Sequence, residues 1–132
     1  MINTVTINNN TTFIIYTIEE LEKLINNREY VDNLYIGTNE DINHLLRHLT
    51  DLTYLYFDNC YNQLTDLSLL SNLQHLQFGW HYNQPTNLSY LTNLTLLAFG
   101  VNYNQSTDLS SLINLKRLYF GNSDNQIKMH KN

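Results

Sequence analysis

The best candidate for a metal-binding site in this sequence is a pair of histidines. His44 and His48 are four residues apart, and Glu40 and Asp41 come shortly before them. On a helix this spacing presents two imidazoles on one side, which suits zinc. No third ligand follows at a spacing known for zinc sites, and the segment is expected on a solvated surface. We therefore predict no metal site and no cofactor.

The other residues that could catalyse a reaction follow a repeating pattern and do not stand apart from it. Serine and aspartate recur at fixed places, whereas a catalytic residue would break the period. Each glycine is alone in its unit, so no glycine-rich loop could hold a phosphate. The one cysteine, Cys60, cannot form an internal disulfide, and we interpret it as a packed thiol. The sequence predicts no catalytic residues and a protein that is not an enzyme.

The pattern itself is a motif Leu-x-x-Leu-x-Phe that returns at a constant interval. Its four copies begin at Leu52, Leu73, Leu94 and Leu115, and a degenerate copy begins at Val31, so that the sequence position rises by 21 each time. A fixed period of this size indicates a solenoid, in which one small unit stacks on copies of itself. We expect residues 31–132 to form one degenerate, three full and one partial repeat. Residues 1–30 should form an N-terminal cap, a hairpin plus a helix, within one structural domain overall.

Each repeat combines a short strand with a turn that carries Tyr-Asn-Gln. Leu55 and Phe57 alternate with Tyr54 and Tyr56, as in a strand with one buried face, and neighbouring strands should pair in parallel. We expect the asparagine of the triplet to be buried, where it could satisfy the backbone groups of adjacent turns. The predicted structural ladder is Asn62, Asn83, Asn104 and Asn125. The tyrosines Tyr61, Tyr82 and Tyr103 should form a second layer beside the column Phe57, Phe78, Phe99 and Phe120.

The return path of each repeat carries helix-capping signals. An Asp or Asn precedes two leucines spaced i,i+3, which predicts one turn of α- or 3₁₀-helix. A following asparagine should end the turn in the left-handed conformation; these asparagines are Asn72, Asn93 and Asn114. In the cap, Thr17 and Glu20 form a capping box before a helix with Leu21, Leu24 and Ile25 on one side.

These motifs resemble the leucine-rich repeat superfamily, and in particular the FNIP or FGxxFN class of slime moulds and giant DNA viruses. The segment Phe78-Gly79-Trp80-His81-Tyr82-Asn83-Gln84-Pro85 matches the class motif with Tyr for its second Phe. Asp58 departs from the motif where Gly is expected, and the Asp-Leu-Ser-x-Leu part is similar to internalin-like repeats. The resemblance implies an α/β solenoid: a right-handed coil with a short parallel sheet on the concave face and short α or 3₁₀ turns on the convex face. It also implies protein–protein interaction.

Charge and targeting signals narrow the class of partner. The net charge is −5, and no Lys or Arg occurs between Arg47 and Lys116. Nucleic-acid binding needs a basic stripe, so we predict no nucleic acid partner. No signal peptide or bilayer-spanning stretch is visible, so we expect a cytoplasmic protein without a membrane partner, in the host cytoplasm if the source is viral.

The predicted working surface is the concave strand face and its rim. Its residues are Tyr35, Tyr54, Tyr56, His75, Gln77, Trp80, Leu96, Arg117 and Tyr119. Tyr, Trp and Arg dominate binding hot spots. The alternative, which stays open, is that stacked Tyr and His side chains only pack against each other across the strands.

We therefore predict a non-catalytic protein–protein interaction module that binds an unknown protein, a host protein if the source is viral. The alternative is a self-assembling structural protein. It follows from Leu118, Phe120 and Ile127, which no further repeat covers, so that a homodimer could form through the open repeat end or the cap.

Overall fold

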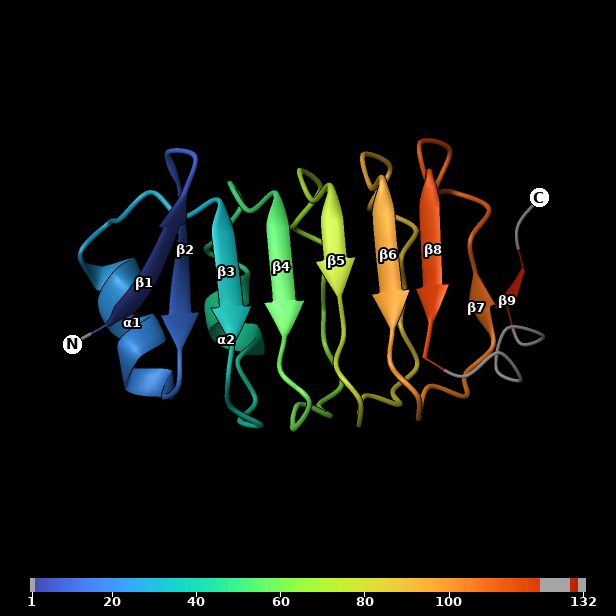
Figure 1. Ribbon diagram of the computed structural model, residues 1–132, viewed down its shortest axis with the longest axis horizontal. Helices are drawn as coiled ribbons and strands as arrows, with labels where there is room; N and C mark the ends of the chain where they lie inside the picture. Colours follow the sequence, from blue (N-terminus) through green and yellow to red (C-terminus); the bar gives the residue numbers. More distant parts are fainter. Residues whose placement is uncertain (1, 122–128, 131–132) are drawn as a thin grey trace.

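The computed structural model describes residues 2–121 and 129–130 of the chain. Its main feature is an open, mostly parallel seven-stranded sheet in the order β1-β2-β3-β4-β5-β6-β8 (Figure 1). The strands are β1 (Asn3–Ile7), β2 (Asn10–Ile15), β3 (Asn33–Ile36), β4 (Tyr54–Phe57), β5 (His75–Gln77), β6 (Leu96–Phe99) and β8 (Arg117–Phe120). Two short strands, β7 (Thr107–Asp108) and β9 (Met129–His130), form a separate pair. The helices are α1 (Ile18–Asn26) and α2 (Asn43–Leu46).

The strands pair in the register of the sequence repeat, which confirms the predicted parallel pairing. Asn33 pairs with Tyr54, Tyr54 with His75, and His75 with Leu96, each a step of one sequence repeat. Equivalent side chains therefore lie beside one another across the sheet. The alternation within each strand then sends one set to the core and the other to the opposite face.

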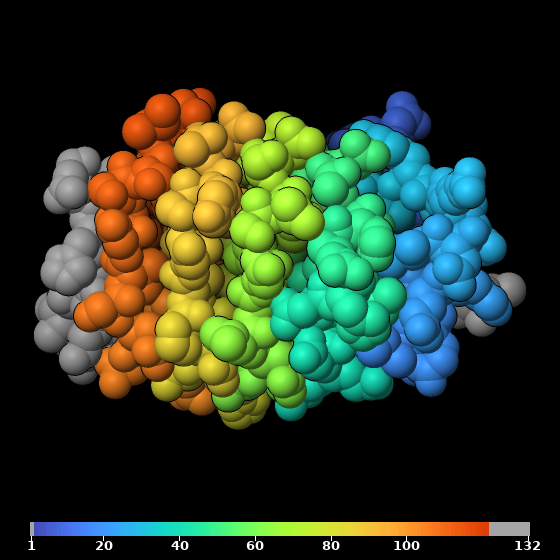
Figure 2. Space-filling model, turned by 180° about the vertical axis from the view of Figure 1, so that it is seen from behind, coloured from blue at the N-terminus to red at the C-terminus, as the bar shows by residue number. Residues whose placement is uncertain are grey.

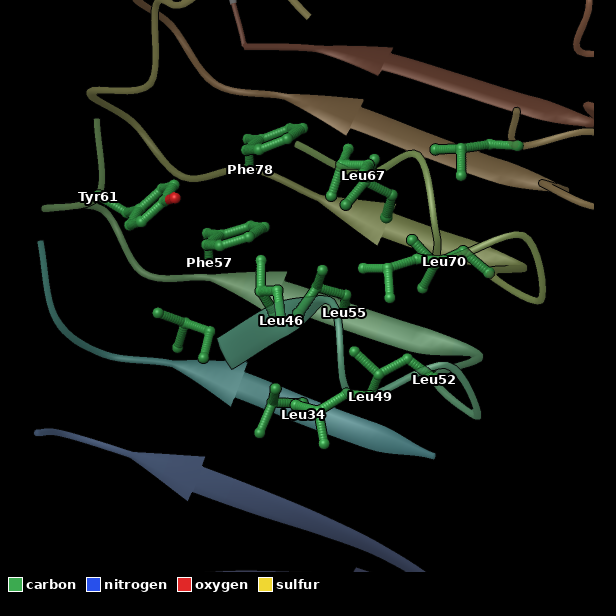
Figure 3. Packing of buried hydrophobic residues seen from close by; sticks show 14 of the residues in the cluster. Leu34, Leu46, Leu49, Leu52, Leu55, Phe57, Tyr61, Leu67, Leu70 and Phe78 are labelled. Atoms are coloured by element: carbon green, nitrogen blue, oxygen red, sulfur yellow. The ribbon is translucent and has the colours of Figure 1, made fainter. Parts of the chain in front are cut away.

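Leucines and two layers of aromatic rings form the core between the sheet and the return segments. The ring centroids of Phe78 lie 5.0 Å from Phe57 and 5.5 Å from Phe99, with nearly parallel planes. The buried tyrosines stack in the same way, with 6.2 Å between Tyr61 and Tyr82. Figure 3 shows the rings of Phe57 and Phe78 one above the other, with Tyr61 beside them. The two predicted aromatic layers are confirmed.

A buried tyrosine hydroxyl needs a hydrogen-bond partner, and a threonine four residues later supplies it. Tyr82 and Thr86 hydroxyls are 2.6 Å apart, and so are those of Tyr103 and Thr107. The spacing Tyr-x-x-x-Thr recurs in the sequence, but it was not among the predicted features.

The N-terminal segment forms the predicted hairpin and helix. Asn8 and Asn9 have φ of 52° and 68°, as a two-residue hairpin turn between β1 and β2 requires. Thr17 and Glu20 form the capping box that starts α1, and Leu21 is fully buried. β2 also pairs in parallel with β3, at the same offset as the later repeats, so that this segment continues the same sheet.

The return segments after β4, β5 and β6 each contain the predicted single turn, closed by an i→i+3 hydrogen bond of the 3₁₀ type and preceded by an Asp or Asn cap, and the segment after β3 contains α2. The Leu70 N–H donates to the Leu67 carbonyl at 3.0 Å, and Asp66 Oδ1 accepts from the Ser68 N–H at 3.0 Å. The expectation of left-handed asparagines is wrong, because none of the three has a positive φ. Their side-chain amides instead donate to a carbonyl of the preceding repeat, as from Asn72 to Thr50 at 2.9 Å. Asn93 and Asn114 bond Ser71 and Thr92 in the same way.

The asparagine ladder lies at the surface, so the prediction that these residues are buried is wrong. Asn62 Oδ1 accepts from the Asn83 N–H at 2.9 Å, and Asn83 Oδ1 from the Asn104 N–H at 2.9 Å. Asn62 and Asn104 are exposed and Asn83 is partly exposed, because the inward position beside them belongs to the tyrosines. The ladder begins one repeat earlier, where Asn39 Oδ1 accepts from the Asn62 N–H at 2.8 Å. Asn125 lies outside the described residues.

Candidate interaction face of the sheet

One face of the sheet carries the core, and the other carries two rows of outward side chains. Figure 1 looks at the strands with α1 and α2 behind them, and Figure 2 shows the return segments from behind as successive bands. We call the uncovered side the open face. By register its first row is Thr12, Asn33, Tyr54, His75, Leu96 and Arg117, of which Asn33 is buried. Its second row is Ile14, Tyr35, Tyr56, Gln77, Ala98 and Tyr119.

The structure brings the predicted site residues together on this face, with one exception. All predicted strand residues lie in these two rows, whereas Trp80 lies in the turn after β5 and is 53% exposed. Its backbone N–H donates to Asn59 Oδ1 at 3.0 Å. Trp80 still borders the open face, since it lines a shallow hollow of about 210 Å³ together with Gln77 and Ala98.

The middle of the open face is partly occupied by side chains that pack against each other. The rings of Tyr54 and His75 have centroids 4.1 Å apart, and Tyr54 is 6.4 Å from Tyr56. Burial, and then the charge of Arg117, lowers the pKa of His75. Burial likewise raises the pKa of Tyr56. Tyr54 therefore packs against His75 of the neighbouring strand and against Tyr56 of its own strand, which accounts for these three rings without a partner.

The end of the open face near β8 is different, because its large side chains extend into solvent. Gln77 and Arg117 are exposed, and Tyr119 is 51% exposed. Between them lies Ala98, whose side chain is small. Large amphipathic side chains therefore surround a shallow depression above Ala98 at this end. The depression is accessible to another molecule.

The opposite end of the open face contains a polar pair that sequence reasoning missed. The Tyr35 hydroxyl donates to Asp58 Oδ1 at 2.7 Å. Burial first, and then this bond, raises the pKa of Tyr35 to about 12. The same bond is the main cause that lowers the pKa of Asp58. The signal was present in the sequence, since Asp58 stands at the repeat position that is glycine in the other copies, at Gly37, Gly79, Gly100 and Gly121.

Cys60 lies next to this pair and is exposed, so the prediction of a packed thiol is wrong. The neighbouring Tyr61 takes the inward position instead. The Cys60 thiol donates to Asp58 Oδ2 at 3.5 Å, and burial followed by this bond raises the pKa of the thiol. A raised pKa keeps the sulfur protonated and therefore a weaker nucleophile.

The histidine pair of the sequence lies away from the open face. His44 belongs to the single turn of α2, His48 follows it, and both are exposed. In the part of the chain that the structure describes, no group of three His, Cys, Asp or Glu could hold a metal ion. None of the helices described there is long and apolar enough to cross a bilayer.

The last strand of the sheet is β8, which leaves its apolar side chains half-buried. Leu118 and Phe120 pack against the core from one side, and Phe120 lies 6.1 Å from the ring of Phe99. Ile127 of the predicted open end lies outside the described residues.

No protein-family model matches this chain, and no curated protein matches it.

Proposed function

We propose that this chain is a non-catalytic interaction module of leucine-rich repeat type that binds a protein partner in the cytoplasm through its open face. The observation that carries the proposal is the accessible end of that face. Large exposed side chains lie around the small Ala98 there, and they belong to Gln77, Arg117, Tyr119 and Trp80. Trp, Tyr and Arg are the residue types that contribute most binding energy at protein interfaces.

The regular register supports the leucine-rich repeat part of the proposal. A constant step between paired strands, equal to the sequence repeat, with leucines and rings stacked in columns, is what one repeated coil would produce. Such a coil presents one long strand surface, and repeat proteins use such surfaces to bind other proteins. If the source is viral, the partner is expected to be a host protein.

Alanine scanning of the open face tests the proposal. Tagged wild-type protein and the variants Trp80→Ala, Tyr119→Ala and Tyr56→Ala are used to capture partners from extracts of the native cell. Tyr90→Ala is the matched control, because Tyr90 is 54% exposed but lies on a return segment. We expect Trp80→Ala and Tyr119→Ala to weaken the captured complex by about 2 kcal/mol or more. Tyr56→Ala should have a smaller effect, and Tyr90→Ala none.

The proposal is wrong if Tyr90→Ala abolishes capture while the three open-face variants retain it. Each variant is first checked by circular dichroism, so that loss of the partner is not confused with loss of the fold.

A second candidate function is self-assembly, and the half-buried Leu118 and Phe120 on the last strand favour it. A second copy could cover this end and form a homodimer. Light scattering over a range of concentrations measures this directly. A dimer that dissociates in Phe120→Ser supports assembly, and a monomer at millimolar concentration contradicts it.

A further inference from the structure

We propose that the hollow at the β1–β4 end of the open face is a subsite for the cationic side chain, Lys or Arg, of a residue on the protein partner. The hollow has a volume of about 450 Å³. Its lining residues are Val5, Thr12, Ile14, Tyr16, Tyr35 and Asp58. This inference rests on the proposed function, because it specifies the chemistry of a partner that binds the open face.

The hollow is built from segments far apart in the sequence. Val5 comes from β1, Ile14 from β2 and Tyr35 from β3, and Asp58 follows β4 directly. The register places Ile14 beside Tyr35 in the second row of the open face. The site therefore exists only in the folded sheet, on the open face but at the end opposite to the accessible area near β8.

Asp58 is the only charged residue in this lining, and its charge has no basic counterpart there. Its pKa is lowered by hydrogen bonds from the Tyr35 hydroxyl, the Asn59 backbone and the Cys60 thiol. No basic side chain of the described residues is among these causes. Asp58 is thus an ionised carboxylate that is held in place by neutral donors.

The carboxylate keeps acceptor capacity for a ligand. An ionised carboxylate offers about four lone-pair sites. Tyr35 occupies one at 2.7 Å on Oδ1, the Asn59 backbone N–H occupies a second, and the Cys60 thiol makes only a long contact of 3.5 Å with Oδ2, so at least one site remains. Because Asp58 is partly exposed, an ammonium or guanidinium group can reach it and form a charge-assisted hydrogen bond.

The rest of the lining suits the stem of a basic side chain. Lys and Arg carry three or four methylene groups behind the charge, and these groups pack well on apolar surface. Val5 and Tyr16 are 46% and 53% exposed, and Ile14 is partly exposed beside them. Aromatic rings next to a carboxylate also favour a cation. An acidic or uncharged polar side chain would gain little from this combination.

The position of Asp58 in the repeat supports a role other than packing. At the equivalent place in the next two repeats the chain has Gly79 and Gly100, where a Cβ would lie 2.6 Å and 2.3 Å from backbone atoms of the preceding repeat. At Gly37, one repeat before Asp58, the closest atom to such a Cβ is 3.0 Å away, so the array is less crowded at this end. Asp58 departs from the repeated residue and introduces an isolated charge, which the stacking of repeats does not require.

The net charge of −5 favours the same partner chemistry at longer range. No Lys or Arg lies between Arg47 and Lys116, so the middle of the array adds no repulsion toward a basic surface. A basic segment of a partner would therefore be attracted, and its approach would be faster at low salt.

Titration of the free protein with short peptides tests the subsite. The probes are the capped tripeptide Gly-Lys-Gly and its counterpart with norleucine, which has an uncharged side chain of similar length. Two-dimensional ¹⁵N–¹H spectra follow the amide signals of Ile14, Tyr35 and Asp58. We expect saturable shifts at these residues with the lysine peptide, in the millimolar range, and much smaller shifts with norleucine.

Two matched variants separate the subsite from general electrostatics. Asp58→Asn removes the charge with almost no change of shape and should weaken binding about tenfold, as the loss of one charge-assisted hydrogen bond predicts. Glu22→Gln removes an equal charge from an exposed position of α1 and should leave binding unchanged. If Asp58→Asn fails to fold, the variant Asp58→Gly, which introduces the residue that the other repeats have at this position, takes its place in the titration.

Three results would overturn the inference: equal shifts with lysine and norleucine, no saturation with either, or unchanged binding in Asp58→Asn. The titration needs no partner, so its outcome is independent of the capture experiment. Loss of capture in Trp80→Ala together with failed peptide binding would leave the proposed function in place and remove only this subsite.

Discussion

Replacing Phe78 with alanine tests whether the stacked rings hold the sheet and the return segments together. Phe78 is 2% exposed and contacts three rings, with centroid distances of 5.0 Å to Phe57, 5.5 Å to Phe99 and 3.8 Å to Tyr82. Truncation of a buried Phe costs about 3–5 kcal/mol. Stacked pairs add about 0.5–1.5 kcal/mol each beyond the buried area. The measured range for truncation already includes the lost ring contacts, so the three stacked pairs place Phe78→Ala in its upper half, at a loss of about 4–5 kcal/mol of unfolding free energy.

Denaturant unfolding followed by far-ultraviolet circular dichroism measures this loss. In a domain of this size 1 kcal/mol corresponds to about 3–4 °C, so the melting temperature should fall by about 12–20 °C. Trp80→Ala is the control, because it removes a larger aromatic ring that is 53% exposed. It should change stability by no more than about 0.5 kcal/mol. Phe78→Leu retains much of the volume and should lose about 1–2 kcal/mol, which keeps the comparison measurable if Phe78→Ala is largely unfolded.

A loss below about 1 kcal/mol in Phe78→Ala, or a loss equal to that of Trp80→Ala, would refute the reasoning. Either result would mean that the rings do not form a continuous core. Neighbouring repeats depend on one another for burial, so the wild-type chain should also unfold in one transition.

Three further perturbations have outcomes that follow from single contacts. Gly100→Ala should lower the unfolding free energy by about 1–3 kcal/mol, and with it the melting temperature, because the new Cβ would lie 2.3 Å from the Gly79 carbonyl oxygen. Gly37→Ala should lose less, because the nearest atom there belongs to a side chain at 3.0 Å. Asn83→Ala removes the acceptor for a backbone N–H of the next repeat and should cost about 1 kcal/mol in denaturant unfolding; no measurable change would mean that water replaces the ladder. Burial raises the pKa of Tyr61 from 10.0 to about 12, so the stability that its neutral phenol contributes is complete below pH 10.0 and is lost as the pH rises toward 12. The unfolding free energy of the wild type should thus fall above pH 10.0 by up to about 1.4 kcal/mol per pH unit for this residue, and that of Tyr61→Phe should fall less steeply.

The features that sequence reasoning predicted correctly are those that the repeat imposes many times over. Leu55 and Phe57 alternate with outward tyrosines, and the same alternation in later copies makes the pairing of the strands readable. The ring columns follow from that register. The capping box at Thr17 and Glu20 is local, and local hydrogen bonds of this kind need no knowledge of the rest of the fold.

The features that it missed or misplaced depend on contacts between different parts of the chain. β2 continues the register of the repeat, although residues 10–30 lack the leucine motif, because β-pairing needs backbone groups and not a particular side chain. The burial of the Asn62 ladder was wrong because two neighbouring residues of one turn cannot both point inward, and Tyr61 has more apolar surface to bury. The partnership of Tyr35 with Asp58 joins two different repeats, and no helix or strand periodicity marks such a pair.

The contrast between the two faces of the sheet gives a physical reason to seek function on the open one. Core positions must fill the same space in every repeat, so Leu55, Leu76 and Leu97 are identical, and close packing tolerates little else. The second row of the open face has no such requirement, and its residues from β2 to β6 all differ except for two adjacent tyrosines. A surface that contacts only water would not need the half-exposed rings of Trp80 and Tyr119 at one end. It would also not need, at the other end, the Asp58 carboxylate that accepts hydrogen bonds from uncharged donors. The variation within this one row is not required by the stacking of repeats, and it supports the proposal that the open face binds another molecule.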